Sequence, residues 1–228
     1  MPRIATPEVT LLGMTDTVYG ALYPMELDVD SDHGEDLMEF SGRSCYQSFH
    51  KPNEATRSNK DYLANILKQG HESVLEHVSA TFYLTGVSRA LTHELIRHRH
   101  LSYSQLSQRF VDEKEAAMVV PPALRDDHVA VEILGEAFDY ALWTYQELVQ
   151  TLEHKGLPRK QAREAARAVL PNCTETRIVV TGNVRAWRDF LKKRLDPAAD
   201  AEIREVAQMI FRDLNLLFPS AFQDFDSE

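Results

Sequence analysis

The chain has 228 residues, a length that suits one domain with a sizeable hydrophobic core. Its apolar fraction of 43% and charged fraction of 26% are ordinary for a soluble globular protein. The net charge of −10 argues against nucleic acid as an obligate partner, although it leaves room for a local basic site. No apolar run is long enough to cross a bilayer, and the first residues lack the order of a signal peptide. We therefore expect a single domain over residues 1–228, in the cytoplasm, with no membrane partner.

Apolar periodicity and turn residues in the first half of the chain predict helices mixed with strands. Residues 78–84 alternate apolar and polar side chains, which is typical of a strand with one buried face. Gly70 ends a helix that begins at residue 60, and another helix begins at about Ser88. The remaining predictions in this half are a strand over residues 9–12, a helix over residues 36–46 and a polar loop over residues 100–108.

The second half is predicted to be mainly helical. A long helix covers residues 127–155 and ends at Gly156, and Pro158 begins another that reaches residue 170. Asn183 caps a helix that ends at Arg194. The other elements are a strand over residues 119–120, stopped by two prolines, a strand over residues 176–181 and a final helix over residues 200–217. We predict the mixed α+β class, with helices packed on a small sheet.

A basic segment over residues 95–110 differs from the acidic chain around it. It reads LIRHRHLSYSQLSQRF and contains no acid. The guanidinium groups of Arg97, Arg99 and Arg109 suit a phosphate or another anion. The alternative is that Arg97 and Arg99 only complement the negative end of a helix dipole.

The direction of the two arginines bears on what this segment binds. If the helix continues through them, Arg97 and Arg99 point roughly 200° apart, because successive helical residues turn by about 100°. They then serve two ligands, or one ligand that wraps around the helix end. Glu94 lies one turn before Arg97, and we expect it to orient that side chain.

The same segment resembles the signature of the flavin-dependent thymidylate synthases, the ThyX family. The signature is RHR, seven residues and serine, here Arg97 to Arg99 followed by Ser107, and its extended form ends at Arg109. The resemblance covers most of the chain from about Cys45 onward. It includes HESVLEH at residues 71–77, ARAVLP at residues 166–171 and GNVRAWRDFLKKR at residues 182–194.

The resemblance implies an enzyme that methylates dUMP to dTMP. Family members use FAD, with 5,10-methylenetetrahydrofolate and NADPH as co-substrates, and form homotetramers with shared active sites and helices packed on a small, mainly antiparallel sheet. The implied FAD contacts are Ser73, Arg97, His98, Arg99, Gln105, Asn183, Arg185 and, more weakly, Asp189. The implied dUMP contacts are Glu94, Arg97, Gln105, Ser107, Arg109 and Arg167, with His71 near the folate and flavin rings and Arg194 promoting ionisation of the uracil ring.

Several of these residues also look unusual for a purely structural role. Arg194 continues an apolar stripe of its predicted helix, so it needs a partner if it is buried, or else extends its head to solvent. Arg185 stands in a first helical turn, where an anionic neighbour would offset the helix dipole. Arg167, by contrast, shares an i, i+4 row with Arg159 and Arg163 that is typical of a solvated face.

Other chemistries are less well supported by the residue pattern. His93 and Glu94 do not begin an HExxH motif, so we expect no metal site. We expect Ser107 to form hydrogen bonds and not to act as a nucleophile, and Cys45 and Cys173 to be small buried side chains. Asp189 departs from the family, because an ionised carboxylate cannot donate a hydrogen bond to flavin. Two rival functions remain open, a non-enzymatic anion-binding protein and a flavoprotein with another substrate, as does the choice between NADPH and NADH.

Overall fold

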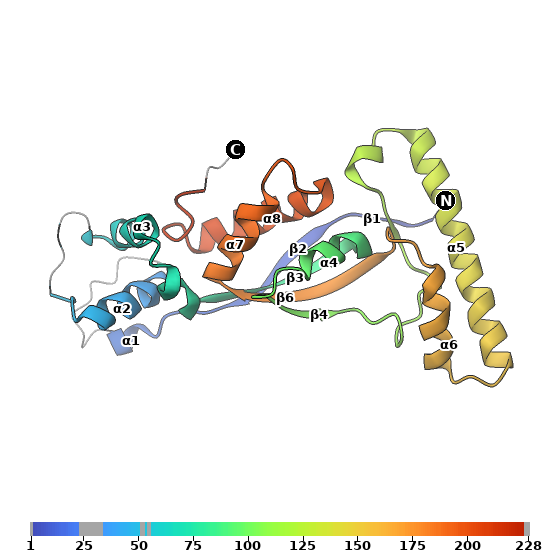
Figure 1. Cartoon of the computed structure of the whole chain (residues 1–228), viewed down its shortest axis with the longest axis horizontal. Coiled ribbons are helices and arrows are strands. Elements are labelled where there is room, and N and C mark those ends of the chain that lie inside the picture. Colours follow the sequence, from blue (N-terminus) through green and yellow to red (C-terminus); the bar gives the residue numbers. More distant parts are fainter. Residues whose placement is uncertain (1, 23–33, 51–52, 54–55, 226–228) are drawn as a thin grey trace.

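The computed structural model describes residues 2–22, 34–50, 53 and 56–225. The molecule is elongated, with a twisted sheet in the middle and helices at each end (Figure 1). The sheet has the strand order β2–β3–β6–β4, and every neighbouring pair is antiparallel. Its strands are β2 (Glu8–Met14), β3 (Ser79–Ser88), β6 (Glu175–Asn183) and β4 (Ser102–Gln105). The predicted α+β class with an antiparallel sheet is confirmed.

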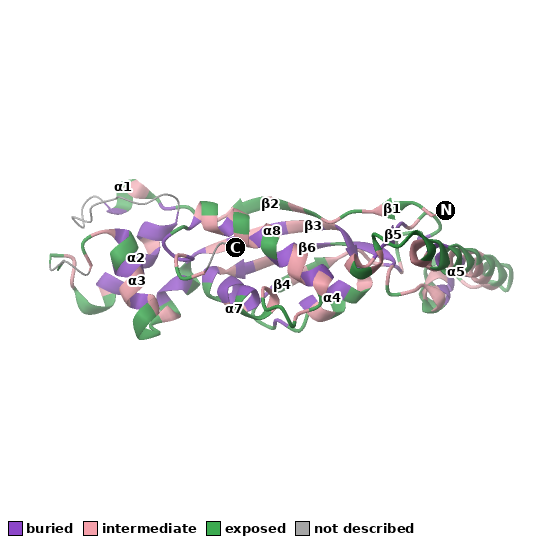
Figure 2. Cartoon of the chain, turned by 90° about the horizontal axis from the view of Figure 1, so that it is seen from above, coloured by how far each residue is buried: buried purple, intermediate pink, exposed green. Residues whose placement is uncertain are grey.

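One face of this sheet carries the main hydrophobic core. The alternation predicted for residues 78–84 is confirmed, since Ala80, Phe82 and Leu84 of β3 are buried on that face. The face is covered by α4 (Arg89–Leu95), α7 (Val184–Arg194) and α8 (Ala201–Leu217), as Figure 2 shows from above. On the opposite face the hydroxyl groups of Thr81 and Thr181 are 2.9 Å apart and only half-buried.

Helices flank the sheet at both ends. At one end lie α1 (Tyr19–Leu22), α2 (Glu35–Tyr46), α3 (Asn59–Gln69) and the 3-10 helix η3 (Glu72–His77). At the other end, α5 (His128–His154) and α6 (Arg159–Ala166) pack against each other, and η5 (Arg167–Val169) follows. A second small sheet pairs β1 (Ile4–Ala5) in parallel with β5 (Met118–Val119), just before η4 (Pro122–Leu124).

The predicted capping residues fix most helix ends. Asn183 accepts a hydrogen bond from the Ala186 backbone N–H, and Ser88 accepts one from Leu91, so α7 and α4 begin where their sequences predict. Gly70 adopts a φ of 70°, which a glycine tolerates better than other residues, and it ends α3 as predicted.

Two predicted elements are wrong in part. The loop predicted over residues 100–108 contains strand β4, which pairs with β6. The sequence of β4 is too polar to be recognised as a strand. An edge strand pairs on one side only, and Ser102 and Ser104 point outward to solvent. The helix predicted to reach residue 170 is α-helical only to Ala166 and continues as one 3-10 turn, since Pro171 constrains the residues before it.

Gly86 allows the N-terminal segment to cross β3 closely. Its φ is 64°, and a Cβ atom built there would lie 1.8 Å from the backbone oxygen of Thr6. Replacing Gly86 with alanine should therefore lower the free energy of unfolding by at least about 2 kcal/mol. A thermal melt compared with Gly13→Ala, whose Cβ would meet no atom within 4 Å, measures this. Equal melting temperatures for the two variants would contradict the prediction.

Candidate active site

The signature segment meets the end of α7 through Arg194. The Arg194 side chain donates from Nη1 to Oε2 of Glu94 at 2.5 Å and from Nη2 to the Glu94 backbone oxygen at 3.2 Å. Its Nε donates to Nε2 of His98 at 2.9 Å. Only 17% of the Arg194 side chain is exposed, so this arginine has the partners that its place on an apolar stripe requires. Three of its five N–H groups are used, which leaves two for a ligand.

His98 is a buried, neutral acceptor at the centre of this contact. Burial, followed by the charge of Arg194, lowers the pKa of His98 to about 4. Its ring packs edge-on against Phe190, with centroids 5.0 Å apart. Because Nε2 accepts from Arg194, the ring proton resides on Nδ1, which lies 3.9 Å from Oδ2 of Asp189. That Asp189 oxygen also accepts from Nζ of Lys193 at 2.8 Å.

The turn that carries Arg97 and Arg99 differs from the prediction. Helix α4 ends at Leu95, before both arginines, so their directions do not follow from a continuing helix. Tyr103 holds the turn, since its hydroxyl lies 2.7 Å from the Leu95 backbone oxygen and 2.8 Å from that of His98. Both arginines are exposed and have no side-chain hydrogen bond or ion pair within the described chain. The expected orienting contact between Glu94 and Arg97 is wrong, because Glu94 pairs with Arg194.

A second group of the predicted residues lies where η3 meets the start of α7. A cavity of about 330 Å³ is lined by His71, Ser73 and Arg185, among others. Another of about 520 Å³ is lined by Asn183, Arg185 and Asp189, with His100 and Lys192. Arg185 therefore borders both cavities. The anionic neighbour expected for it is Glu76, whose Oε1 lies 2.5 Å from Nη1.

A third group joins the end of the signature segment to α6. Arg109 pairs with Glu164 at 2.6 Å, and the Ser107 hydroxyl accepts from the Arg109 backbone N–H at 3.4 Å. The solvated row predicted on α6 is wrong at Arg163, which is 11% exposed and donates to the Phe110 backbone oxygen at 2.8 Å and to Asp112. This contact fixes the loop beside α6 and Arg167.

Gln105 connects the third group to the sheet. Its amide Nε2 donates to the hydroxyl of Thr92 at 3.0 Å and lies 3.4 Å from that of Thr176.

The two cysteines differ from the expectation that both are buried. Cys45 is exposed and Cys173 is half-buried. Burial raises the pKa of the Cys173 thiol, which disfavours the reactive thiolate.

Sequence reasoning missed Arg89, the first residue of α4. Burial lowers the pKa of its guanidinium; the charge of Glu113 opposes this shift and that of Arg167 adds to it. Arg89 therefore lies within electrostatic range of Arg167. Its position in the sequence could have indicated it. A cation in the first turn of a helix is disfavoured by the helix dipole, at Arg89 as at Arg185, so an anionic neighbour is expected there.

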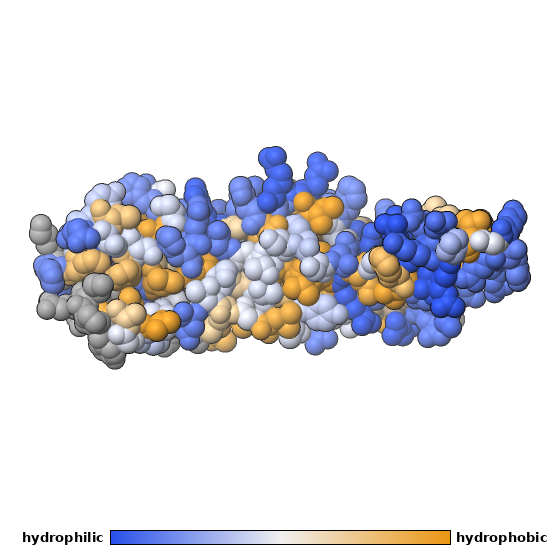
Figure 3. Space-filling model, turned by 90° about the horizontal axis from the view of Figure 1, so that it is seen from below, coloured by the Kyte–Doolittle hydropathy of each residue, from blue (hydrophilic) through white to orange (hydrophobic). Residues whose placement is uncertain are grey.

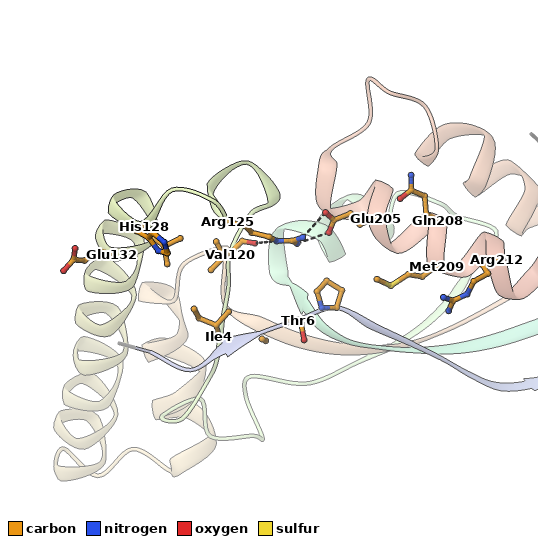
Figure 4. A pocket seen from close by; sticks show the side chains of 13 residues that line it. Ile4, Thr6, Val120, Arg125, His128, Glu132, Glu205, Gln208, Met209 and Arg212 are labelled. Carbon is orange, nitrogen blue, oxygen red and sulfur yellow. Dashed lines mark hydrogen bonds and ion pairs between the residues drawn. The ribbon is translucent and has the colours of Figure 1, made fainter. Parts of the chain in front are cut away.

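Among the residues that the structure describes, the three groups do not share one pocket. Arg185 and Arg194 stand at the two ends of α7, about 13 Å of helix rise apart. Arg109 and Arg167 lie by α6, at the far end of the molecule from α2 and α3 (Figure 1). A further cavity of about 990 Å³ is lined by none of the predicted residues. It lies between β1, α5 and α8, beside the two-pronged ion pair of Arg125 with Glu205 (Figure 4).

Two further classes of feature are absent from the part of the chain that the structure describes. No group of three His, Cys, Asp or Glu side chains gathers there in a way that would hold a metal ion. None of the helices there has the length and hydropathy needed to pass through a membrane.

The chain is similar over nearly its whole length to mycobacterial enzymes. The family described as thymidylate synthase complementing protein matches residues 28–220. The flavin-dependent thymidylate synthase of Mycobacteroides abscessus is 52% identical over 235 residues, which cover 99% of this chain and 92% of that protein. The enzymes of the same name from Mycobacterium tuberculosis and Mycobacterium avium are 52% identical over 233 residues, with the same coverage. The chain therefore belongs to the thymidylate synthase complementing protein family, that of the flavin-dependent thymidylate synthases.

Proposed function

We propose that this protein is a flavin-dependent thymidylate synthase. It methylates dUMP to dTMP, with 5,10-methylenetetrahydrofolate as the one-carbon donor and NADPH-reduced FAD as the hydride source. The observation that carries the proposal is the contact of Arg194 with Glu94 and His98. This contact joins the RHR signature to the segment over residues 182–194, which resembles a later segment of the same family.

The residues around the two cavities beside η3 and α7 suit FAD. Arg185, His100 and Lys192 line the larger cavity, and such donors suit a pyrophosphate group. Within the chain Arg185 and Lys192 pair with Glu76 and Glu72, which line the same cavity, so FAD would exchange these ion pairs for its own phosphate oxygens. Arg99 precedes His100 and is exposed, so its guanidinium is available to an anion. When bound, FAD supplies the hydride. The residues proposed to hold it are Ser73, Arg97, His98, Arg99, Gln105, Asn183 and Arg185, with a weaker contribution from Asp189.

The proposed work of Arg194 is electrostatic. Negative charge develops on the uracil ring during methylation, and a fixed guanidinium lowers the energy of that charge. Glu94 and His98 hold Arg194 at three points, so little reorganisation is needed when the charge appears. Because His98 is neutral at pH 7, it orients the arginine without adding a second positive charge.

The proposed dUMP contacts combine the first and third groups of residues. The first group, at the end of α4, supplies Glu94 and Arg97. The third group, beside α6, supplies the hydroxyl of Ser107 and the guanidinium groups of Arg109 and Arg167. Gln105 lies between them on β4. His71 is proposed to lie near the folate and flavin rings.

The colour of the protein tests this function at low cost. Purified protein should be yellow, with flavin absorbance, and dUMP should change the flavin spectrum. Protein that is colourless and cannot be reconstituted with FAD would favour a non-enzymatic anion-binding protein. A flavin spectrum that dUMP leaves unchanged would favour a flavoprotein with another substrate.

We propose that the working form is a homotetramer with shared active sites, in the cytoplasm, in which each chain is a single domain over residues 1–228. The scatter of the predicted residues into three groups supports the sharing. Two uncovered surfaces support assembly. One is the sheet face opposite the helices, where pale and apolar areas lie along the middle of the molecule, next to a more hydrophilic end at α5 and α6 (Figure 3). The other is an exposed apolar stripe on α5, formed by Val129, Ile133, Tyr140 and Trp143, which are 55–68% exposed.

Changes on the α5 stripe should disrupt this assembly. In the Tyr140→Ser/Trp143→Ser variant, light scattering should report smaller species, and the rate of dTMP formation per chain should fall more than tenfold at low protein concentration, because shared sites come apart. The control is Asp139→Asn on the same helix, because Asp139 is exposed and lies to one side of the apolar stripe. A monomer with full activity would overturn the tetramer proposal.

A further inference from the structure

Glu113 is a buried acid that the proposed function does not use. It lies in the loop between the signature segment and β5, and it is 4% exposed. Its Oε1 has no hydrogen-bond partner within the described chain. The hydroxyl of Tyr145 on α5 accepts from the Glu113 backbone N–H at 3.4 Å. A buried carboxyl oxygen without a partner is costly, so its retention calls for a reason other than stability.

The charged groups that face Glu113 come from three elements. Arg89 of α4 is the cation among them, and Glu175 of β6 and Asp112 of its own loop are the acids. Glu175 already pairs with Arg177, and Asp112 pairs with Arg163. Glu113 is therefore the acid left to face Arg89. Burial raises the pKa of Glu113 to about 7, although the charge of Arg89 opposes this shift.

Arg89 and Arg167 form a pair of cations without bonded anions. Each lies within electrostatic range of the other, which is unfavourable unless an anion lies between them. Neither has a side-chain hydrogen bond or a close ion pair within the described chain. The neighbouring Arg109, in contrast, is paired with Glu164. Two unpaired guanidinium groups beside one buried carboxyl group suit a dianion such as a phosphate monoester.

We propose that Glu113 is the internal counter-ion of the Arg89–Arg167 pair and takes up a proton from solvent when the dUMP phosphate binds to these arginines. The inference rests on the proposed function, in which dUMP is the substrate. Without the phosphate, the Glu113 carboxylate balances one of the two arginine charges. With the phosphate bound, a carboxylate beside it would repel the dianion, so the protonated acid is favoured. Glu113 is thus a positioning residue for the arginines.

This coupling makes dUMP binding depend on pH with a defined sign. Glu113 must be protonated in the complex, so binding weakens as pH rises above the pKa of the free carboxyl, near 7. The phosphate of dUMP loses its second proton near pH 6, which would strengthen binding with rising pH. Measurements from pH 7.0 to 8.5 therefore isolate the protein group.

The test compares dUMP binding by the FAD-loaded protein with that of Glu113→Gln. The dissociation constant of the natural protein should rise about tenfold from pH 7.0 to 8.5, whereas that of Glu113→Gln should change less than about twofold. Calorimetry in buffers with different ionisation heats should show proton uptake with dUMP but not with deoxyuridine. Glu35→Gln is the matched control, because Glu35 is also buried with a pKa raised to about 7 but lies on α2. It should keep the natural pH dependence.

Several results would overturn the proposal. Binding of dUMP by the natural protein without proton uptake would do so and needs no variant, so misfolding of Glu113→Gln cannot mask the outcome. A Glu113→Gln protein that keeps the tenfold pH dependence would also contradict it. Failure of the proposed function looks different, because the FAD-loaded natural protein would then not bind dUMP at any pH.

Discussion

Replacing Arg194 with alanine should lower the rate of dTMP formation about 100- to 1,000-fold while FAD remains bound, the usual cost of removing one preorganised donor. The structure explains why the effect should fall on turnover. Glu94 and His98 hold Arg194 at three points. This contact lies at the opposite end of α7 from Arg185, which lines the cavities proposed for FAD. Loss of the guanidinium removes stabilisation of the charge on the uracil ring without removing the donors proposed for FAD. Steady-state kinetics and the flavin absorbance of the purified variant measure the two properties separately.

Two controls sharpen this prediction. Arg212→Ala, at a side chain that is 76% exposed, should keep the natural rate. Arg194→Lys keeps the charge but loses the three-point geometry, so it should recover only part of the rate. Near-normal turnover of Arg194→Ala would remove Arg194 from the catalytic role, and loss of FAD from that variant would show that it serves the cofactor instead.

Replacing Asp224 with alanine should lower the free energy of unfolding by about 3 kcal/mol. Arg188 of α7 is 1% exposed and donates to both oxygens of Asp224, at 2.7 and 2.6 Å, and to the Ala221 backbone oxygen. Its guanidinium also lies 5.0 Å from the ring centre of Phe225. Without Asp224 a buried cation loses its counter-charge, which weakens the hold of the C-terminal segment on α7. The melting temperature should fall by about 6–12 °C for a chain of this size.

A double variant separates this mechanism from a general loss of packing. The guanidinium of Arg188 is buried, although the Asp224 side chain is 43% exposed. Replacing the arginine as well removes the stranded charge, so Arg188→Met combined with Asp224→Ala should recover most of the lost stability. Asp213→Ala, on the adjacent helix α8, should change the melting temperature little. If the double variant melts at a lower temperature than Asp224→Ala alone, the stranded charge is not the cause.

Periodicity and capping residues were sufficient to predict the main elements of this fold. Helices α4 and α7 begin at Ser88 and Asn183 because these side chains satisfy N–H groups that a helix start leaves without partners, and such local chemistry is written in the sequence. Strand β4 could not be found in this way. Its pairing with β6 is a contact between distant residues, and Ser102 and Ser104 face solvent, so no apolar pattern marks it.

The candidate site was predictable as a set of residues but not as an arrangement. The signature implied Glu94 and Arg194 separately, yet their contact spans 100 positions and depends on how α4 and α7 pack. Arg97 and Arg99 were misplaced because the sequence does not show that α4 ends at Leu95. Glu113 was missed altogether, since one acid in a charged loop has no distinctive pattern and only its burial separates it from its neighbours.

The proposed activity of this protein is the formation of dTMP by the flavin-dependent route. Release of tritium from dUMP labelled at C5 of the uracil ring tests it most directly, because methylation replaces that hydrogen. The assay should contain the FAD-loaded protein, NADPH and 5,10-methylenetetrahydrofolate, and dTMP should be measured alongside. We predict tritium release with matching dTMP formation when all components are present, and loss of dTMP when NADPH or the folate is omitted or when the protein has been stripped of FAD. Full dTMP formation by the FAD-free protein, or none with every component present, would show that the protein does not use this route.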